Sequence, residues 1–213
     1  SLCYSPTLIH EMPPPQLQAP AQKNNFITYG CFNNFAKITD ELLYLWRAIL
    51  ERVPNSRLIL KNKLCSLDEG RELIRKKFSK MSFPLERVEL RPYSPDYLEQ
   101  YREIDVALDT SPYTGGTTTC EALYMGVPVV TLRGKTHGAR LGASILNAAD
   151  LSELVAQSPM EYINKAVQLA RRRELLIAYH VGLREHMQTS ALMNSANYIR
   201  SLEEIYKGVL SWL

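Results

Sequence analysis

The sequence predicts an α/β fold in which a doubly wound parallel sheet is followed by a C-terminal helical appendix. Short apolar runs rich in β-branched residues alternate along the chain with longer segments whose apolar residues recur at helical spacing. Five such strands fit within roughly 110 residues, enough for one domain with helices on both faces of a parallel sheet. From about residue 159 onward the pattern is helical only, in two or three pieces.

The first strand–helix–strand unit carries the clearest signals. Phe26–Tyr29 is a short apolar strand, and a polar loop follows it. Thr39 or Asp40 can cap the next helix, because a side-chain oxygen there accepts a hydrogen bond from an orphan amide. The apolar residues of this helix recur at helical spacing, at Leu42, Trp46, Ile49, Leu50 and Val53. Pro54 stops the helix before a second strand over 57–61.

The later elements continue the alternation. The strands are short runs built around valine and leucine, and the helices begin after polar or glycine-containing loops. In chain order we expect a charged helix over 67–80, a strand over 88–90, a short helix over 95–102, a strand over 105–109, a helix over 118–125, a strand over 127–132 and a helix over 139–148.

Residues 1–25 are predicted to be a proline-rich linker, and residues 26–213 to form the folded lobe with its C-terminal helices. Five of the 12 prolines occur within the first twenty positions, including the run Pro13–Pro15. Such a run favours an extended polyproline conformation. We therefore expect this segment to contribute little to the core.

Composition excludes several classes of protein. Of the 213 residues 46% are hydrophobic and 22% are charged, which is ordinary for a globular domain. The net charge of +3 is too small to indicate a nucleic-acid or membrane partner. No apolar run approaches the roughly 18 residues of a bilayer-spanning helix. The first residues also lack the basic and apolar regions of a signal peptide.

The cysteines indicate a reducing, cytoplasmic environment. They are far apart and form no CxxC pair, which favours free thiols over a disulfide framework or a zinc site; they are Cys3, Cys31, Cys65 and Cys120. In the helical tail we expect His180 and His186 at the surface and Arg171–Arg173 on a solvated helix face.

One loop carries most of the functional signal. It follows the predicted strand over 105–109, and in an open α/β sheet ligands bind outside the carboxyl ends of the strands. Two glycines that allow close approach of backbone precede three threonines at a helix start: Gly115, Gly116, Thr117, Thr118 and Thr119. The positive end of that helix suits a phosphate group. The alternatives are that Thr117 or Thr118 only caps the helix, and that Glu121 complements the helix dipole rather than binding ribose hydroxyls.

A second loop, Phe32–Lys37, follows the first strand and places Lys37 just before a helix. A lysine there is electrostatically unfavourable because of the helix dipole, and a local rule that is broken often marks function. The alternative is an exposed lysine without a task. Weaker candidates at strand ends are His137, Lys61 and Lys63, for which an exposed position without a ligand is the alternative.

Several motifs are absent from the sequence. It contains no GxGxxG, GxxxxGKS/T or GxSxG string, which argues against ordinary dinucleotide binding, Walker-type hydrolysis of nucleotides and a hydrolase nucleophile elbow. No DxD string suggests a paired-aspartate metal site. Amides, hydroxyls and lysine would have to meet the charge of a bound diphosphate, so we expect no metal cofactor.

Four strings resemble, in order, the C-terminal catalytic lobe of the O-linked GlcNAc transferase and SPINDLY family. They are FITYGCFNNFAKIT, VPNSRLILKNK, DVALDTSPYTGGTTTCEALYMGVPVVTLRG and ARLGASIL, and the similarity runs from about Pro13 to the C-terminus. The resemblance implies a Rossmann-like, nucleotide-sugar-binding lobe of a GT-B glycosyltransferase. It also implies two partners within a longer parent chain: an N-terminal catalytic lobe and tetratricopeptide repeats.

The resemblance implies a role for each candidate residue. Lys37 matches a lysine that contacts the donor diphosphate and stabilises the leaving group, which makes it the catalytic candidate. Tyr97 and Gly116 each stand where the GlcNAc transferases have a histidine, and Tyr97 would lie beside the base. Asn34 and the threonines would reach the diphosphate, and Glu121 the ribose. The full donor-binding set is Asn34, Tyr97, Gly115, Gly116, Thr117, Thr118, Thr119 and Glu121.

The function implied is inverting transfer of GlcNAc from UDP-GlcNAc to Ser or Thr hydroxyls of an acceptor protein, without a metal. One alternative is O-fucosyl transfer from GDP-fucose, because FNNFAKIT and TTTCEALYMGVP are at least as close to the SPINDLY branch. Another is a nucleotide-binding lobe without transferase activity. A sugar-nucleotide epimerase is less favoured, since the lobe shows no acidic and histidine-rich cleft. The isolated chain is expected to be inactive because it supplies one wall of a two-lobe cleft.

Overall fold

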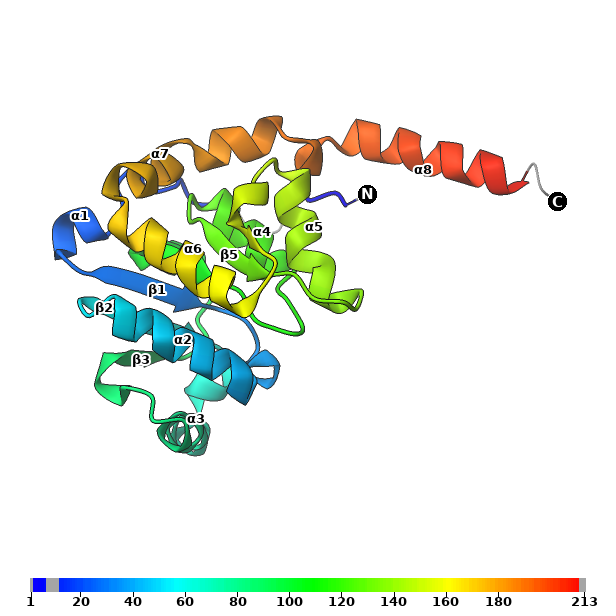
Figure 1. The fold of residues 1–213 in the computed structure, drawn as a ribbon. Coiled ribbons are helices and arrows are strands. Elements are labelled where there is room, and N and C mark those ends of the chain that lie inside the picture. Colours follow the sequence, from blue (N-terminus) through cyan, green and yellow to red (C-terminus); the bar gives the residue numbers. More distant parts are fainter. Residues whose placement is uncertain (1, 7–11, 211–213) are drawn as a thin grey trace.

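A computed structural model describes residues 2–6 and 12–210. Within them the strands form one parallel sheet with the order β3-β2-β1-β4-β5-β6 (Figure 1). The strands are β1 (Ile27–Cys31), β2 (Ser56–Lys61), β3 (Val88–Arg91), β4 (Val106–Leu108), β5 (Val129–Leu132) and β6 (Val155–Ala156). The order is that of a Rossmann fold, and the predicted doubly wound parallel sheet is confirmed.

The winding direction reverses between β1 and β4. The chain first proceeds from β1 outward to β2 and β3, then returns to the middle of the sheet for β4 and continues toward the other edge. β1 and β4 are direct neighbours, with Tyr29 opposite Val106 and Gly30 opposite Ala107. At such a switch point the loops after the two central strands leave toward opposite faces, and a crevice remains between them.

The main helices follow the predicted alternation. They are α2 (Asp40–Arg52), α3 (Asp68–Lys80), α4 (Thr117–Tyr124), α5 (Leu141–Ala148), α6 (Pro159–Arg171), α7 (Arg173–Thr189) and α8 (Ser195–Leu210). Thr39 caps α2, because its hydroxyl oxygen accepts a hydrogen bond from the Leu42 amide at 3.2 Å. The short helix expected over 95–102 is instead a 3-10 helix over Glu99–Glu103.

Two elements were not predicted. α1 (Ala21–Asn24) is a single turn, and β6 extends the sheet through two pairs, Val155 opposite Thr131 and Ala156 opposite Leu132. Two residues are too few for a strand pattern to be visible in a sequence. The expectation of five strands is therefore wrong by one short edge strand.

The N-terminal segment contributes more to the fold than its prolines suggested. Ala19 and Ala21 are only 1% and 3% exposed, and the Ala21 amide donates to Asp105 Oδ1 at 2.8 Å. The carbonyl oxygens of Pro13 and Pro14 accept hydrogen bonds from arginines of the lobe. The expectation that this segment contributes little to the core is wrong for these residues. The domain boundary at residue 25 remains a prediction.

Helices cover both faces of the sheet, so its central strands are buried throughout. Leu58, Ile59 and Leu60 of β2 are all 0% exposed, although successive side chains of a strand point to opposite faces. α2 and α6 pack side by side in front of the sheet in Figure 1. α2 buries Trp46 completely, and α6 buries Tyr162. Each large apolar side chain buried in this way stabilises the fold by roughly 1.5–3 kcal/mol.

A chain of buried hydrogen bonds joins this helical layer to the end of β4. Trp46 Nε1 on α2 donates to the Tyr162 hydroxyl on α6 at 3.0 Å. The Tyr162 hydroxyl in turn donates to the backbone carbonyl of Asp109, the residue just after β4, at 2.9 Å. The packing of α2 and α6 therefore sets the position of the segment that leaves β4.

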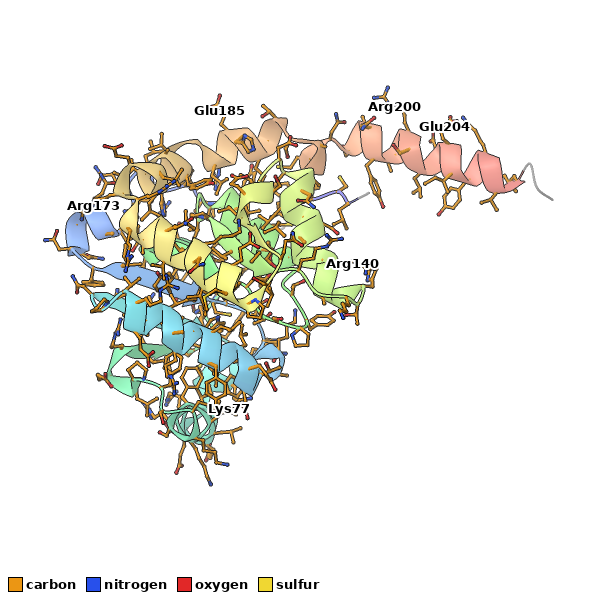
Figure 2. All side chains as sticks on the ribbon, in the orientation of Figure 1. Lys77, Arg140, Arg173, Glu185, Arg200 and Glu204 are labelled. Atoms are coloured by element: carbon orange, nitrogen blue, oxygen red, sulfur yellow. The ribbon has the colours of Figure 1, made fainter. Side chains whose placement is uncertain are left out.

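The C-terminal helices differ in how they pack. α6 belongs to the layer over the sheet, and α7 buries one face of its length. His180 on α7 is 2% exposed, so the expected surface position is wrong; its burial lowers its pKa to about 4, and Nε2 lies 3.0 Å from the Asp105 carbonyl oxygen. α8 buries no residue and extends away from the body of the lobe, with Arg200 and Glu204 projecting from it (Figures 1 and 2). The term appendix therefore applies to α8 alone.

None of the helices in the ranges 2–6 and 12–210 is both long and apolar enough to cross a bilayer.

Tyr162→Phe should lower the free energy of unfolding of this chain by about 1–3 kcal/mol, because the Trp46 indole N–H then remains buried without its acceptor. Urea denaturation measures the change. Tyr44→Phe is the matched control, since Tyr44 is 52% exposed and its loss of a hydroxyl should change stability by less than about 0.5 kcal/mol. Equal losses in both variants would contradict the role of the buried hydrogen bond.

Candidate functional site

The loops that follow β1 and β4 meet at the carboxyl end of the sheet. Lys37 Nζ on the β1 loop donates to the Thr114 carbonyl oxygen on the β4 loop at 3.0 Å. The Thr118 hydroxyl at the start of α4 donates to Asn33 Oδ1 on the β1 loop at 2.7 Å. The two loops that the sequence singled out are therefore in direct contact, at the switch point where open α/β sheets bind ligands.

A pocket of about 380 Å³ opens beside these loops, within the range of roughly 300–1,000 Å³ typical of small-molecule sites. Residues from the ends of β1 and β2, the segment after β3 and the start of α4 line it: Phe32, Asn34, Lys61, Asn62, Lys63, Leu64, Tyr93, Tyr97, Thr117, Thr118 and Glu121. The pocket thus brings together five of the predicted site residues, namely Asn34, Tyr97, Thr117, Thr118 and Glu121.

Four lining residues were missed by the sequence analysis. Phe32 and Asn62 directly follow β1 and β2, and this position at a strand end was the signal that could have found them. Leu64 and Tyr93 lie in connecting segments whose place beside the pocket depends on how the sheet is ordered. Nothing in their local sequence indicates a ligand.

The start of α4 borders the pocket, which Thr117 and Thr118 line. The Gly115 amide donates to Asp109 Oδ1 at 2.6 Å, and the Thr119 amide donates to the Gly116 carbonyl at 3.1 Å, so both are used within the fold. The amides of Gly116, Thr117 and Thr118 make no hydrogen bond with any described residue. Unused amides at a helix start carry the positive end of the helix dipole and suit an anionic group.

Gly115 and Gly116 differ in how much room a side chain would have at each position. A Cβ at position 115 would lie 2.5 Å from Thr119 Oγ1 and 2.8 Å from Thr118 Oγ1, and 3.0 Å from Asp109 Oδ1. Only glycine fits there without moving the loop. A Cβ at Gly116 would meet only Leu141 Cδ2, at 3.3 Å.

The Thr118 hydroxyl is oriented by its neighbours. Asn33 is 6% exposed and directs its Nδ2 toward Asp109 Oδ1 at 3.4 Å, which turns its Oδ1 toward Thr118. The proton of the Thr118 hydroxyl is therefore engaged by Asn33. In this arrangement the amide of Thr118, rather than its hydroxyl, is available to donate to a ligand.

Lys37 lies against the β4 loop, outside the lining of the pocket. Besides its bond to Thr114, Nζ stands 4.3 Å from the centre of the Tyr113 ring, a cation–π contact. Partial burial lowers the pKa of Lys37, and the charge of Asp109 opposes this shift. The ammonium group has further protons to donate beyond the one given to Thr114. It is thus a half-buried cation beside the glycine-containing loop.

Asn34 lies on the rim of the pocket and is exposed. Its Oδ1 accepts a hydrogen bond from the Ala36 amide at 3.0 Å and so caps the 3-10 helix Phe35–Lys37. Asn34 therefore helps to set the direction in which Lys37 leaves the backbone.

Tyr97 and Glu121 form a pair in the pocket wall. The Tyr97 hydroxyl donates to Glu121 Oε1 at 2.6 Å, and Glu121 is 9% exposed. Burial, followed by this hydrogen bond, raises the pKa of Tyr97 well above its usual value. Tyr101 shares a face with Tyr97 in the sequence, but it is buried, and its ring packs 4.4 Å from that of Phe32. Of the two tyrosines, only Tyr97 lines the pocket.

The weaker candidates from the sequence differ in their burial and in their distance from the pocket. Lys61 is 4% exposed and donates from Nζ to the Pro92 carbonyl at 2.5 Å and to the Ser94 hydroxyl at 2.8 Å, so it is not a solvated strand end. Its burial lowers its pKa. Lys63 is exposed on the pocket rim, and His137 is exposed outside the pocket.

Asp109 is a buried carboxylate beneath the loops, and it was not predicted as a site residue. Burial raises the pKa of its carboxyl to about 6, although hydrogen bonds from Thr131, Gly115 and Thr110 and the charge of Lys37 oppose the shift. Across residues 2–6 and 12–210, no group of three or more His, Cys, Asp or Glu side chains is placed to hold a metal ion.

Comparison with known proteins identifies the family. Residues 16–202 match the model of glycosyl transferase family 41. The chain belongs to this family. A Solanum lycopersicum protein named probable UDP-N-acetylglucosamine–peptide N-acetylglucosaminyltransferase SPINDLY is 41% identical over 211 residues, which are 98% of this chain and 22% of that protein. The family 41 chain thus spans about a fifth of the length of such curated relatives.

Solved structures agree with this family 41 membership. An O-GlcNAc transferase mutant from Thermobaculum terrenum matches with a TM-score of 0.80 and 38% identity, over 91% of this chain and 38% of the other. Sucrose-phosphate synthase from Thermosynechococcus elongatus matches with a TM-score of 0.58 at 17% identity, over 94% of this chain and 50% of the other, which shows the fold alone. The fold is that of the C-terminal lobe of a GT-B glycosyltransferase, as the resemblance implied.

Gly115→Ala should destabilise the chain by about 1–3 kcal/mol, because the added methyl group overlaps the Thr118 and Thr119 hydroxyls and forces the loop to move. Gly116→Ala is the matched control, since its methyl group meets only the end of a flexible leucine side chain. Urea denaturation of both variants measures the difference. A Gly115→Ala variant as stable as Gly116→Ala would show that the loop is not packed as described.

Proposed function

We propose that this family 41 chain is the donor-binding lobe of a protein O-glycosyltransferase, which transfers GlcNAc from UDP-GlcNAc to Ser or Thr hydroxyls with inversion. The observation that carries the proposal is the set of amides at Gly116–Thr118 that have no hydrogen-bond partner among the described residues, close to the half-buried cation of Lys37. A diphosphate needs donors and positive charge, and this corner of the lobe offers both. The nucleoside would then occupy the adjoining pocket, between Tyr97 and the end of β2.

The chemistry assigns a separate task to Lys37. In the transfer step the bond between the anomeric carbon and the diphosphate oxygen breaks, and a bond from the acceptor oxygen to that carbon forms. The diphosphate leaves with the electron pair, so negative charge grows where Lys37 and the α4 amides can meet it. The acceptor hydroxyl loses its proton to a base that we do not assign to this lobe. Glu121, held by Tyr97, would accept hydrogen bonds from the ribose.

Two nucleotide sugars are candidates for the donor. The printed names of the SPINDLY relatives and of the Thermobaculum terrenum enzyme support UDP-GlcNAc. Two residues favour GDP-fucose as the second candidate: Tyr97 and Gly116 occupy positions where the resemblance places histidines of the GlcNAc transferases. The Tyr97 hydroxyl is committed to Glu121, and Gly116 has no side chain. Both changes alter the groups that would face the nucleotide and the sugar.

The whole enzyme requires more than this chain. We propose that an N-terminal catalytic lobe and tetratricopeptide repeats of the parent protein supply the second wall of the cleft and the contacts to an acceptor protein. The isolated lobe would then bind nucleotide without transferring sugar. A cytoplasmic location is part of the proposal, supported by four free cysteines, three of which are buried.

Lys37→Ala in the full-length parent should lower sugar transfer by roughly 100-fold or more while donor affinity changes much less, because the lysine charge is most effective once the diphosphate leaves. Radiolabelled UDP-GlcNAc and GDP-fucose, each incubated with enzyme and a protein extract, measure transfer and reveal the donor. Lys80→Ala, on the exposed end of α3, is the matched control and should retain full activity. Unchanged turnover in Lys37→Ala would reject the role of Lys37, and absence of labelled protein with both donors would reject the proposed transfer.

Nucleoside diphosphate binding should not require a divalent metal, since Lys37 and the α4 amides supply the positive charge. Titration of this chain with UDP and GDP, with EDTA and with added Mg²⁺ or Mn²⁺, measures the dependence. Affinities within about twofold across these conditions are expected. Binding that appears only after Mg²⁺ or Mn²⁺ is added would contradict the metal-independent mechanism.

A further inference from the structure

The Asp109 carboxylate lies at the centre of a buried hydrogen-bond network below the proposed diphosphate site. Its Oδ1 accepts from the Gly115 amide at 2.6 Å, the Thr110 amide at 2.8 Å and Asn33 Nδ2 at 3.4 Å. Its Oδ2 accepts from the Thr131 hydroxyl at 2.7 Å. The residue is 2% exposed, so it contacts no ligand in the pocket directly.

The donors to Asp109 come from three separate segments of the chain. Asn33 lies on the β1 loop, Thr110 and Gly115 on the β4 loop, and Thr131 on β5. An ionised carboxylate only accepts hydrogen bonds, whereas a protonated one must donate its own proton. All four partners donate, so the network matches the ionised form and joins the three segments through one charge. No salt bridge within the described residues pairs Asp109 with a cation.

The network reaches the groups that would contact the diphosphate. Asp109 orients Asn33, and Asn33 orients the Thr118 hydroxyl. Asp109 also holds the Gly115 amide inward, while the next amides, of Gly116, Thr117 and Thr118, have no partner in the part of the chain that the structure describes. Gly142 makes room for the carboxylate, because a Cβ there would collide with Asp109 Oδ2 and with the Thr131 hydroxyl bound to it. A Cβ at Gly115 would lie 3.0 Å from Asp109 Oδ1 and closer still to the Thr118 and Thr119 hydroxyls.

We propose that Asp109 is a positioning residue for donor binding, whose carboxylate holds Gly115, Asn33 and through it Thr118 in the arrangement that directs the free α4 amides at a diphosphate. This inference rests on the proposed function. Asp109 acts through these groups and touches neither substrate nor product. Loss of the Asp109 carboxylate should therefore lower the affinity for a nucleoside diphosphate. It should change the affinity for the nucleoside alone very little, because the nucleoside contacts the other end of the pocket.

Substitutions at Asp109 and Asn33 distinguish the effect of the hydrogen bonds from the effect of the charge on Asp109. Asp109→Ala removes all four hydrogen bonds. Asp109→Asn retains an Oδ1 for Gly115, Thr110 and Asn33, and its Nδ2 can donate to the Thr131 hydroxyl oxygen. Lys80→Ala, on the exposed end of α3 and outside the network, is the control. Asn33→Ala interrupts the connection to Thr118 and leaves the other bonds to Asp109 in place.

Ligand-observed NMR titrations of this chain with UDP, GDP, uridine and guanosine test the inference. Asp109→Ala should bind the diphosphate of the preferred nucleotide roughly tenfold or more weakly, with nucleoside affinity changed by less than about threefold. Asp109→Asn should recover most of the loss, Lys80→Ala should bind normally, and Asn33→Ala should lose roughly threefold or more in diphosphate affinity alone. Circular dichroism establishes which variants fold.

Three results would overturn the inference. One is an Asp109→Ala chain that folds and binds UDP or GDP as the wild type does. Another is an equal loss for nucleoside and diphosphate, which indicates a structural role only. If Asp109→Ala fails to fold, unchanged diphosphate binding by Asn33→Ala overturns it. A wild-type chain that binds neither UDP nor GDP would instead reject the proposed function itself, and the inference with it.

Discussion

Asp109, the residue just after β4, joins the fold to the candidate site. Its backbone carbonyl accepts a hydrogen bond from the Tyr162 hydroxyl, which itself accepts one from Trp46 Nε1. The helical layer of α2 and α6 therefore sets where the strand ends. Its carboxylate accepts from the β1 loop, the β4 loop and β5. A buried carboxylate left without these donors would be strongly unfavourable. The loops of the site are therefore held by the same residue that the core positions.

The parallel sheet explains why the site lies where it does. All six strands of the described chain point their carboxyl ends the same way, and the order reverses between β1 and β4. The loops after these two strands thus flank the switch point, and they carry Lys37 and the glycine–threonine run. Helix α4 starts directly after the second loop, so its positive end faces the crevice.

The electrostatics of the site are asymmetric. One corner holds a half-buried lysine and three amides that bind no other described residue, while the pocket wall beyond holds Glu121 with its tyrosine partner. Such an arrangement suits a ligand with an anionic group at one end and hydroxyl groups further along. A nucleotide sugar has this form, and membership in glycosyl transferase family 41 is consistent with it.

The sequence alone determined the alternation of strands and helices, the cap at Thr39 and the positions of the two candidate loops, because these depend on local spacing and on residues close in the chain. Its strings also identified the family. Only the tertiary structure showed β6, the packing of the N-terminal prolines and the burial of His180 and Lys61, since two-residue pairings and long-range burial leave no local pattern. It also decided that Lys37 rests on Thr114, that Tyr97 binds Glu121 and that Asp109 joins the loops. These contacts link residues between 22 and 77 positions apart, and only the folding of the sheet brings them together.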